Sequence, residues 1–250
     1  MPPAPKSLPA LCLPLALLGC STATGVSTTS PPPAPIQQAS EPVTASGPIL
    51  AIGDSIFKWN AETNSDIPTV LGQALGRPVT NSAVSGAHLS LPKDNGSSLD
   101  YDIRQQYQSQ AWDWVVMNGG ANDLAGSCDC QNCDSLLDEM ISADGLTGEI
   151  PEFARQVTAN GSQLMYVGYY AMPADARFGF DQCNDELDTH NARLAQMAAA
   201  LPDVWFVSAT AVVSPENPAA YDTDRVHPSA AGSEQIGRYI AQAIAAVEAE

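Results

Sequence analysis

Ser55 is the residue around which the sequence offers catalytic chemistry. A serine hydroxyl is a weak nucleophile unless a base lies within hydrogen-bond reach. Three histidines could supply that base: His88, His190 and His227. His227 is the best candidate because Asp224 precedes it by three residues, and a turn over that spacing lets the carboxylate hold the imidazole ring. The residues therefore make Ser55 a candidate nucleophile, His227 its candidate base and Asp224 the carboxylate that orients the base.

The other two histidines fit other roles. His190 lies beside the apolar stripe of a predicted helix that carries Leu187, Leu194 and Leu201. A histidine in that position is typical of a structural site in which the ring nitrogens are satisfied, or of the surface. His88 lies in a predicted loop and is a candidate for the wall of a substrate pocket.

Strands and helices alternate along the chain. Apolar runs that end at glycine or polar residues predict strands over 49–52, 78–82, 112–117, 164–167 and 204–207. Apolar residues at helical spacing predict a helix capped by Ser65 or Asp66 and further helices around 136–141, 150–157, 187–201 and 236–247. This alternation predicts a parallel sheet covered by helices on both faces. Functional sites in such sheets lie at the carboxyl ends of the strands, and Ser55 follows the first strand directly.

Four short motifs occur in a characteristic order: Gly53-Asp54-Ser55, Gly86, Gly120-Ala121-Asn122-Asp123 and Asp224-Arg225-Val226-His227. Together they resemble the sequence blocks of the SGNH hydrolases, the GDSL-like lipases and esterases. The resemblance covers nearly all of residues 48–250. It implies a three-layer α/β/α sandwich of the flavodoxin-like type, with a mostly parallel sheet of about five strands. It also implies a serine esterase that works through an acyl-serine intermediate, with no cofactor and no metal.

The same resemblance implies an oxyanion hole. Its donors would be the backbone N–H groups of Ser55 and Gly86 and the side-chain amide of Asn122. The chemistry agrees, because glycine lets the backbone approach a ligand closely and asparagine offers a neutral N–H donor. Asn122 and Asp123 taken alone would also suit a turn that ends a strand.

Neighbouring residues complete the expected site. Trp59 and His88 are candidates to line the substrate pocket. We expect Asp54 to be structural and Tyr169 to belong to ordinary core packing.

Four cysteines fall within the predicted domain: Cys128, Cys130, Cys133 and Cys183. In an oxidising compartment they would form two disulfides, and the sequence leaves three connectivities open. The alternative is a zinc site, which needs about four ligands. We favour disulfides, and expect the 128–133 loop to stiffen the rim of the active site.

The first residues predict export. Residues 1–19 carry Lys6 and a short apolar run, as in a secretory signal, and end in Leu17-Leu18-Gly19 before Cys20. This ending resembles the lipobox of bacterial lipoproteins, which implies a lipid on Cys20 and, with Ser21 following, an outer-membrane address on the periplasmic side. The alternative is a plain signal peptide. Residues 20–47 are rich in Ser, Thr, Pro and Ala and predict a disordered tether before a single domain over 48–250.

The net charge of the chain limits the kinds of partner that it can bind. The chain has 28 acidic and 10 basic residues and a net charge of −18, so we expect no nucleic-acid partner. We expect a monomer that cleaves short-chain acyl or acetyl esters. A first alternative is an O-acetylesterase acting on a cell-envelope or other polysaccharide. A second, of another class, is a non-catalytic envelope lipoprotein that uses the fold as a binding module.

Overall fold

The computed structural model describes residues 47–89 and 101–250. The predicted signal peptide, the lipidation site at Cys20 and the tether lie outside the described residues, apart from Gly47 at the tether's end. Among the described residues, no helix is long and apolar enough to cross a membrane.

The centre of the domain is a parallel sheet of five strands in the order β2-β1-β3-β4-β5. The strands are β1 Ile49–Ile52, β2 Val79–Asn81, β3 Trp114–Met117, β4 Gln163–Gly168 and β5 Val204–Ser208. Every residue of β1 and β3 is buried, as expected for strands that are covered on both faces. All five strands coincide with the runs that the sequence predicts.

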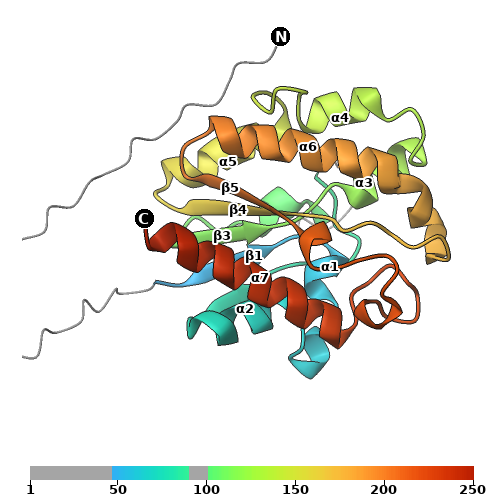
Figure 1. The fold of residues 1–250 in the computed structure, drawn as a ribbon. Coiled ribbons are helices and arrows are strands. Elements are labelled where there is room, and N and C mark those ends of the chain that lie inside the picture. The colour runs from blue at the N-terminus through green and yellow to red at the C-terminus, as the bar shows by residue number, and fades with distance from the viewer. Residues whose placement is uncertain (1–46, 90–100) are drawn as a thin grey trace, which may run out of the picture. The chain divides into compact units, whose positions relative to one another are not determined.

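Helices cover both faces of this sheet (Figure 1). They are α1 Ser55–Lys58, α2 Ile67–Leu75, α3 Ala121–Cys128, α4 Asp134–Met140, α5 Glu149–Ala159, α6 Asn184–Ala200 and α7 Ala230–Glu248. Asp66 caps α2 as predicted, since its side chain accepts a hydrogen bond of 3.0 Å from the N–H of Thr69.

The strand order places the helices in two layers. Right-handed crossovers put α2, between β1 and β2, on one face, and α5 and α6, which follow β3 and β4, on the other. α7 lies against α2, and a Cβ atom at Gly237 of α7 would come within 2.7 Å of Val70, so only glycine allows this approach. The described chain thus confirms the α/β/α sandwich that the sequence predicts.

A buried arginine cluster lies at the end of the sheet where the strands begin. Arg77 precedes β2 and is 6% exposed. Its guanidinium contacts Asp113, just before β3, at 3.0 Å and Glu248, at the end of α7, at 2.6 Å. It also donates two hydrogen bonds to the carbonyl of Gly47. The two ends of the described domain therefore meet at the edge opposite the carboxyl ends of the strands.

Candidate active site

Ser55 lies at the carboxyl end of β1, where it is the first residue of the short helix α1. Asp54 caps this helix, because its Oδ1 accepts a hydrogen bond of 2.9 Å from the N–H of Ile56. Ser55 itself is partly exposed, whereas Gly53, Asp54 and Ile56 around it are buried. The hydroxyl is thus carried on a well-supported turn at the edge of the sheet where ligands bind.

His227 and Asp224 lie together in the turn before α7. The His227 Nδ1 and the Asp224 Oδ2 are 2.6 Å apart. The other carboxylate oxygen accepts the backbone N–H groups of Val226 and His227, at 2.9 and 3.0 Å. Arg225 has a φ of 62°, which is the left-handed conformation that closes this turn. The three-residue spacing seen in the sequence therefore brings the carboxylate to the ring.

The carboxylate of Asp224 is held in its charged form. Burial alone would raise the pKa of Asp224, but hydrogen bonds from the His227 ring and from the N–H groups of His227 and Val226 outweigh it. The pKa of Asp224 consequently lies below the ordinary aspartate value. A charged carboxylate at Nδ1 fixes the imidazole with Nε2 directed away from Asp224, which is the arrangement a general base needs.

Trp59 connects the histidine to the helix of Ser55. Its indole stacks on the imidazole of His227, with ring centroids 3.8 Å apart and planes 6° from parallel. The indole Nε1 donates a hydrogen bond of 2.7 Å to the Asp222 Oδ2. Trp59 follows Ser55 by one helical turn, and its N–H donates to the Ser55 carbonyl at 2.8 Å. Because side chains one turn apart lie on the same side of a helix, the stack places the His227 ring on the Ser55 side of α1.

Gly86 and Asn122 lie in segments that are hydrogen-bonded to each other. Asn122 is in the first turn of α3, and its Nδ2 donates a hydrogen bond of 2.8 Å to the carbonyl of Ala87. An amide nitrogen carries two hydrogens, so Asn122 can donate to Ala87 and to a second acceptor. Gly86 has a φ of 79°, a conformation that glycine adopts at little cost. Asn122 therefore begins a helix, and does not lie in the plain turn that its neighbours alone would suit.

A buried network joins the Ser55 turn to the start of α3. The Asp54 carboxylate accepts hydrogen bonds from the Asn118 Nδ2 at 2.7 Å and from the hydroxyl of Tyr169. That hydroxyl in turn accepts the N–H of Ala121 at 3.3 Å. Burial, together with the neighbouring Asp54 charge, raises the pKa of Tyr169 well above its ordinary value, so its hydroxyl stays protonated and donates. Asp54 is structural, as expected, but Tyr169 does more than fill the core.

Gln106 fixes the backbone just before the serine. Its Oε1 accepts the N–H of Gly53 at 2.7 Å, and its Nε2 donates to the carbonyl of Gly53 at 3.0 Å. Gln106 is 4% exposed and ends the short helical segment Ile103–Gln106. Nothing in the sequence pattern singles out Gln106, Asn118 or the hydroxyl of Tyr169 as supports of the site.

His88 packs beside α3. Its Nδ1 lies 3.8 Å from the Oδ1 of Asp123, and its side chain is 26% exposed. Asp123 is itself buried, and both of its carboxylate oxygens accept the N–H of Leu89, each at 3.0 Å. His88 is therefore partly open to solvent and lies beside the first turn of α3, which contains Asp123.

The expectation that the nitrogens of His190 are satisfied is wrong. His190 is fully buried, and within the described ranges neither ring nitrogen has a hydrogen-bond partner. Burial lowers the pKa of His190 to about 4, with a smaller contribution from Arg193, so the ring is neutral at neutral pH. A Cβ atom at Gly120 would come within 2.9 Å of the His190 Nε2. His190 thus packs directly beneath the glycine that precedes the helix of Asn122.

Residues 51–235 match the model of the GDSL-like Lipase/Acylhydrolase family. The chain belongs to this family. No match was found among curated proteins.

Several solved structures share the fold of this GDSL-like acylhydrolase. A protein of Slackia heliotrinireducens described as an SGNH hydrolase is 22% identical, with a TM-score of 0.51 over 80% of this chain and 99% of that one. A carbohydrate acetylesterase family member from Sinorhizobium meliloti is 16% identical, with a TM-score of 0.58 over 79% and 97%. The aryl esterase of M. smegmatis is 18% identical, with a TM-score of 0.54 over 80% and 99%. At these identities the likeness shows the fold.

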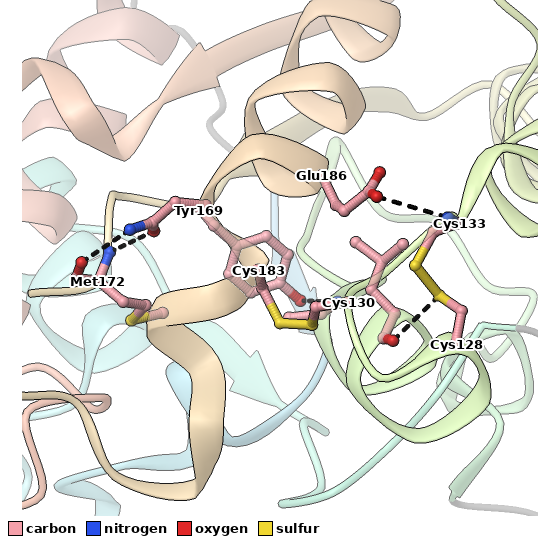
Figure 2. The surroundings of a disulfide bond; sticks show 10 residues. Cys128, Cys130, Cys133, Tyr169, Met172, Cys183 and Glu186 are labelled. Atoms are coloured by element: carbon pink, nitrogen blue, oxygen red, sulfur yellow. Dashed lines mark hydrogen bonds between the residues drawn. A yellow bond between two sulfur atoms is a disulfide. The ribbon is translucent and has the colours of Figure 1, made fainter. Parts of the chain in front are cut away.

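Two disulfides follow the helix of Asn122 in this GDSL-like acylhydrolase (Figure 2). Cys128, the last residue of α3, pairs with Cys133, which precedes α4. Cys130 pairs with Cys183, which lies at the start of α6, 53 residues further along. The prediction of disulfides is confirmed, and the connectivity that the sequence left open is settled. The sulfurs that the zinc alternative requires as ligands are engaged in these bonds.

Proposed function

We propose that the protein is a serine esterase that hydrolyses carboxylic esters through an acyl-serine intermediate, with Ser55, His227 and Asp224 as its triad. The observation that carries the proposal is the contact of 2.6 Å between His227 Nδ1 and Asp224 Oδ2, on a ring that stacks on Trp59 at the end of the helix of Ser55. A binding module has no use for a carboxylate-held imidazole beside a serine. The family membership supports the same class of reaction.

The reaction would run in two displacements. His227 takes the proton of the Ser55 hydroxyl as its oxygen attacks the acyl carbonyl, and the imidazolium that forms is stabilised by Asp224. The imidazolium then protonates the departing alcohol, which leaves the acyl group on Ser55. Water, deprotonated by His227, releases the acid and restores the serine.

Donors near Ser55 would stabilise the negative charge on the former carbonyl oxygen. We assign this role to the N–H groups of Ser55 and Gly86 and to the Asn122 amide. The hydrogen bond from Asn122 to Ala87 orients the amide beside the Gly86 segment before a substrate arrives. In other enzymes, removal of one such pre-organised donor raises the activation free energy by about 3–4 kcal/mol.

The preferred substrates are short-chain acyl or acetyl esters. An alternative is an acetyl group on a cell-envelope or other polysaccharide. A carbohydrate acetylesterase family member and an aryl esterase have the same fold, which supports both kinds of ester as candidates. Trp59 and His88 are the described side chains that we place near the acyl or alcohol group. We expect neither a metal nor a cofactor to take part.

We also propose that the protein is exported. Both disulfides require an oxidising compartment, such as the bacterial periplasm. A lipid anchor at Cys20 and an outer-membrane address are part of this proposal, as is a single domain over residues 48–250 that acts as a monomer.

Hydrolysis of a chain-length series of nitrophenyl esters tests the proposed function. The soluble domain is compared with Ser55→Ala and, as a matched control, with Ser135→Ala on the exposed side of α4. We expect Ser55→Ala to lose roughly 10⁴-fold or more in kcat, as removal of a catalytic serine does elsewhere, and Ser135→Ala to keep full activity. A chelator should have no effect. Retained turnover in Ser55→Ala would sink the assignment.

A further inference from the structure

One surface feature next to the proposed site has no role in the chemistry described above. Phe178 is 75% exposed, far more than the other exposed large apolar side chains of the described residues, Tyr101 at 41% and Leu146 at 38%. It lies in the segment Arg177–Cys183 just before α6. Single exposed apolar residues are common on soluble proteins, so exposure alone does not make Phe178 part of a binding site.

A cavity, here called the Phe178 pocket, lies beside this side chain. It has a volume of about 200 Å³. Its walls come from the Arg177–Cys183 segment on one side and from α3 and the loop after it on the other. They include Phe178, Gly179, Gln182, Ala125, Asp129 and Gln131.

The pocket adjoins both halves of the proposed active site. Ala125 follows Asn122 by three residues on α3, so the two share a helix face. On the other side, the N–H of Arg177 donates a hydrogen bond of 3.0 Å to the carbonyl of Asp224. The Arg225 Nε also lies 3.1 Å from the Asp175 Oδ1. The helix of the proposed oxyanion donor therefore lines the Phe178 pocket, and the residue before Phe178 is hydrogen-bonded to the turn of the proposed base.

The walls of the pocket are held in place covalently. The disulfide between Cys130 and Cys183 ties the loop after α3 to the end of the Phe178 segment (Figure 2). Phe178 and Gly179 both have left-handed backbone conformations, with φ of 63° and 75°. The aromatic ring is thus presented to solvent from a cross-linked support, and its ordering costs little when a ligand binds.

The chemistry of the walls selects a sugar. An aromatic face packs against the C–H face of a pyranose ring, while the amides of Gln131 and Gln182 and the carboxylate of Asp129 can bond with its hydroxyls. A long acyl chain could form no hydrogen bonds with these polar groups. An anionic sugar would be repelled by Asp129 and by the net charge of −18.

We propose that the Phe178 pocket binds a neutral sugar ring of a glycan whose acetyl ester is presented to Ser55. This rests on the proposed esterase function and narrows its substrate class. The aromatic ring and the amide and carboxylate groups around it form the sugar site, and the small ester itself needs none of them.

Binding of plain oligosaccharides tests the site without any catalysis. The probes are xylotetraose, cellotetraose and chitotetraose, with tetragalacturonate as the anionic counterpart, measured by calorimetry on the wild-type protein and its variants. At least one neutral tetrasaccharide should bind, and more tightly than tetragalacturonate. Loss of one stacking ring in Phe178→Ala should weaken it about fivefold to tenfold, and Phe178→Trp should retain it.

Leu146→Ala is the matched control, since it also removes an exposed apolar side chain. Its loop packs on Met197, which is about 20 Å along α6 from the first residue, Asn184. Gln182→Ala provides a second variant of the site, and it should weaken binding as well. If no tetrasaccharide binds, or if Phe178→Ala and Gln182→Ala bind as the wild type does, the sugar site is refuted.

Kinetics separate this proposal from the esterase proposal. On nitrophenyl acetate, Phe178→Ala should match the wild type, because that ester is too small to need the pocket. On an O-acetylated tetrasaccharide its kcat/KM should fall about fivefold to tenfold, in line with the binding loss. Equal losses on both esters would overturn the sugar site. Sugar binding through Phe178 in a protein that hydrolyses neither ester would refute the esterase proposal and leave the pocket standing.

Discussion

The indole of Trp59 lies flat on the imidazole of His227, with ring centroids 3.8 Å apart. The hydrogen bond from the indole Nε1 to Asp222 fixes the stack from the outer side. His227 is thereby held on one edge by Asp224 and on one face by an aromatic surface. An aromatic face also favours the positive charge that an imidazole acquires when it accepts a proton.

The first prediction concerns this stack. Trp59→Ala should lower kcat/KM on nitrophenyl acetate about fivefold to tenfold, because the ring loses a contact of the size typical for aromatic pairs. Trp59→Phe, which keeps a stacking ring, should lose much less. Trp205→Ala on β5 is the control. Trp205 is also partly exposed, but it lies near the amino end of its strand, away from the carboxyl ends where Ser55 lies. Equal losses for Trp59→Ala and Trp205→Ala would contradict a role for the stack.

The second prediction concerns the Asn122 amide. Asn122→Ala should lower kcat about 10²- to 10³-fold with a small change in KM, since an oxyanion donor acts mainly in the transition state. Asn122→Asp should be at least as damaging, because it places a negative charge where the oxyanion would form. Ser127→Ala, on the exposed side of the same helix, should change nothing. A loss of less than about threefold in Asn122→Ala would remove Asn122 from the oxyanion hole.

The third prediction concerns pH and His190. Burial lowers the pKa of His190 to about 4, whereas a histidine in the unfolded chain takes up its proton near pH 6.5. Between these values the unfolded state binds more protons than the folded state, so the free energy of unfolding falls as the pH is lowered. The loss from this residue is about 3 kcal/mol across the window.

Urea unfolding at a series of pH values measures this effect. His190→Leu removes the titrating ring, so its free energy of unfolding should fall less steeply than that of the wild type between pH 6.5 and 4. Other titrating groups are common to both proteins, and the difference between the two slopes reports His190. Parallel slopes would show that the ring is not buried in a neutral form.

The fourth prediction ranks the two disulfides. Under the chain-entropy description, a cross-link over 53 residues stabilises by about 4 kcal/mol and one over 5 residues by about 2 kcal/mol. The double variant Cys130→Ala/Cys183→Ala should therefore lose more stability in urea than Cys128→Ala/Cys133→Ala. It should also disturb sugar binding more, because only the longer link joins the two walls of the Phe178 pocket to each other. The reverse order of stability would contradict this account.

The fold and the order of the motifs could be predicted from the sequence because their signals are local. Buried parallel strands are short apolar runs, and all five are visible as such. Asp224 and His227 are separated by one turn, so their contact needs no knowledge of the rest of the chain. Their catalytic role with Ser55 stays a prediction until the variants are measured.

The supports of the site could not be predicted because they join distant segments. Asp54 and Tyr169 are 115 residues apart, and Gly53 and Gln106 are 53 apart. A tyrosine after a buried strand looks like core packing until its hydroxyl has a partner in space. His190 is a further case, because its place beside an apolar stripe is compatible with a structural site or the surface and does not reveal that its buried nitrogens lack hydrogen-bond partners.

The Arg77 cluster has a consequence for how the molecule faces its surroundings. It gathers Gly47 and Glu248 at the edge where the strands begin, while Ser55 and His227 lie at the edge where they end. Gly47, the first described residue, therefore lies at the end of the sheet opposite the proposed active site. A domain attached to a support at Gly47 would therefore keep the end of the sheet that carries Ser55 and His227 away from the attachment point.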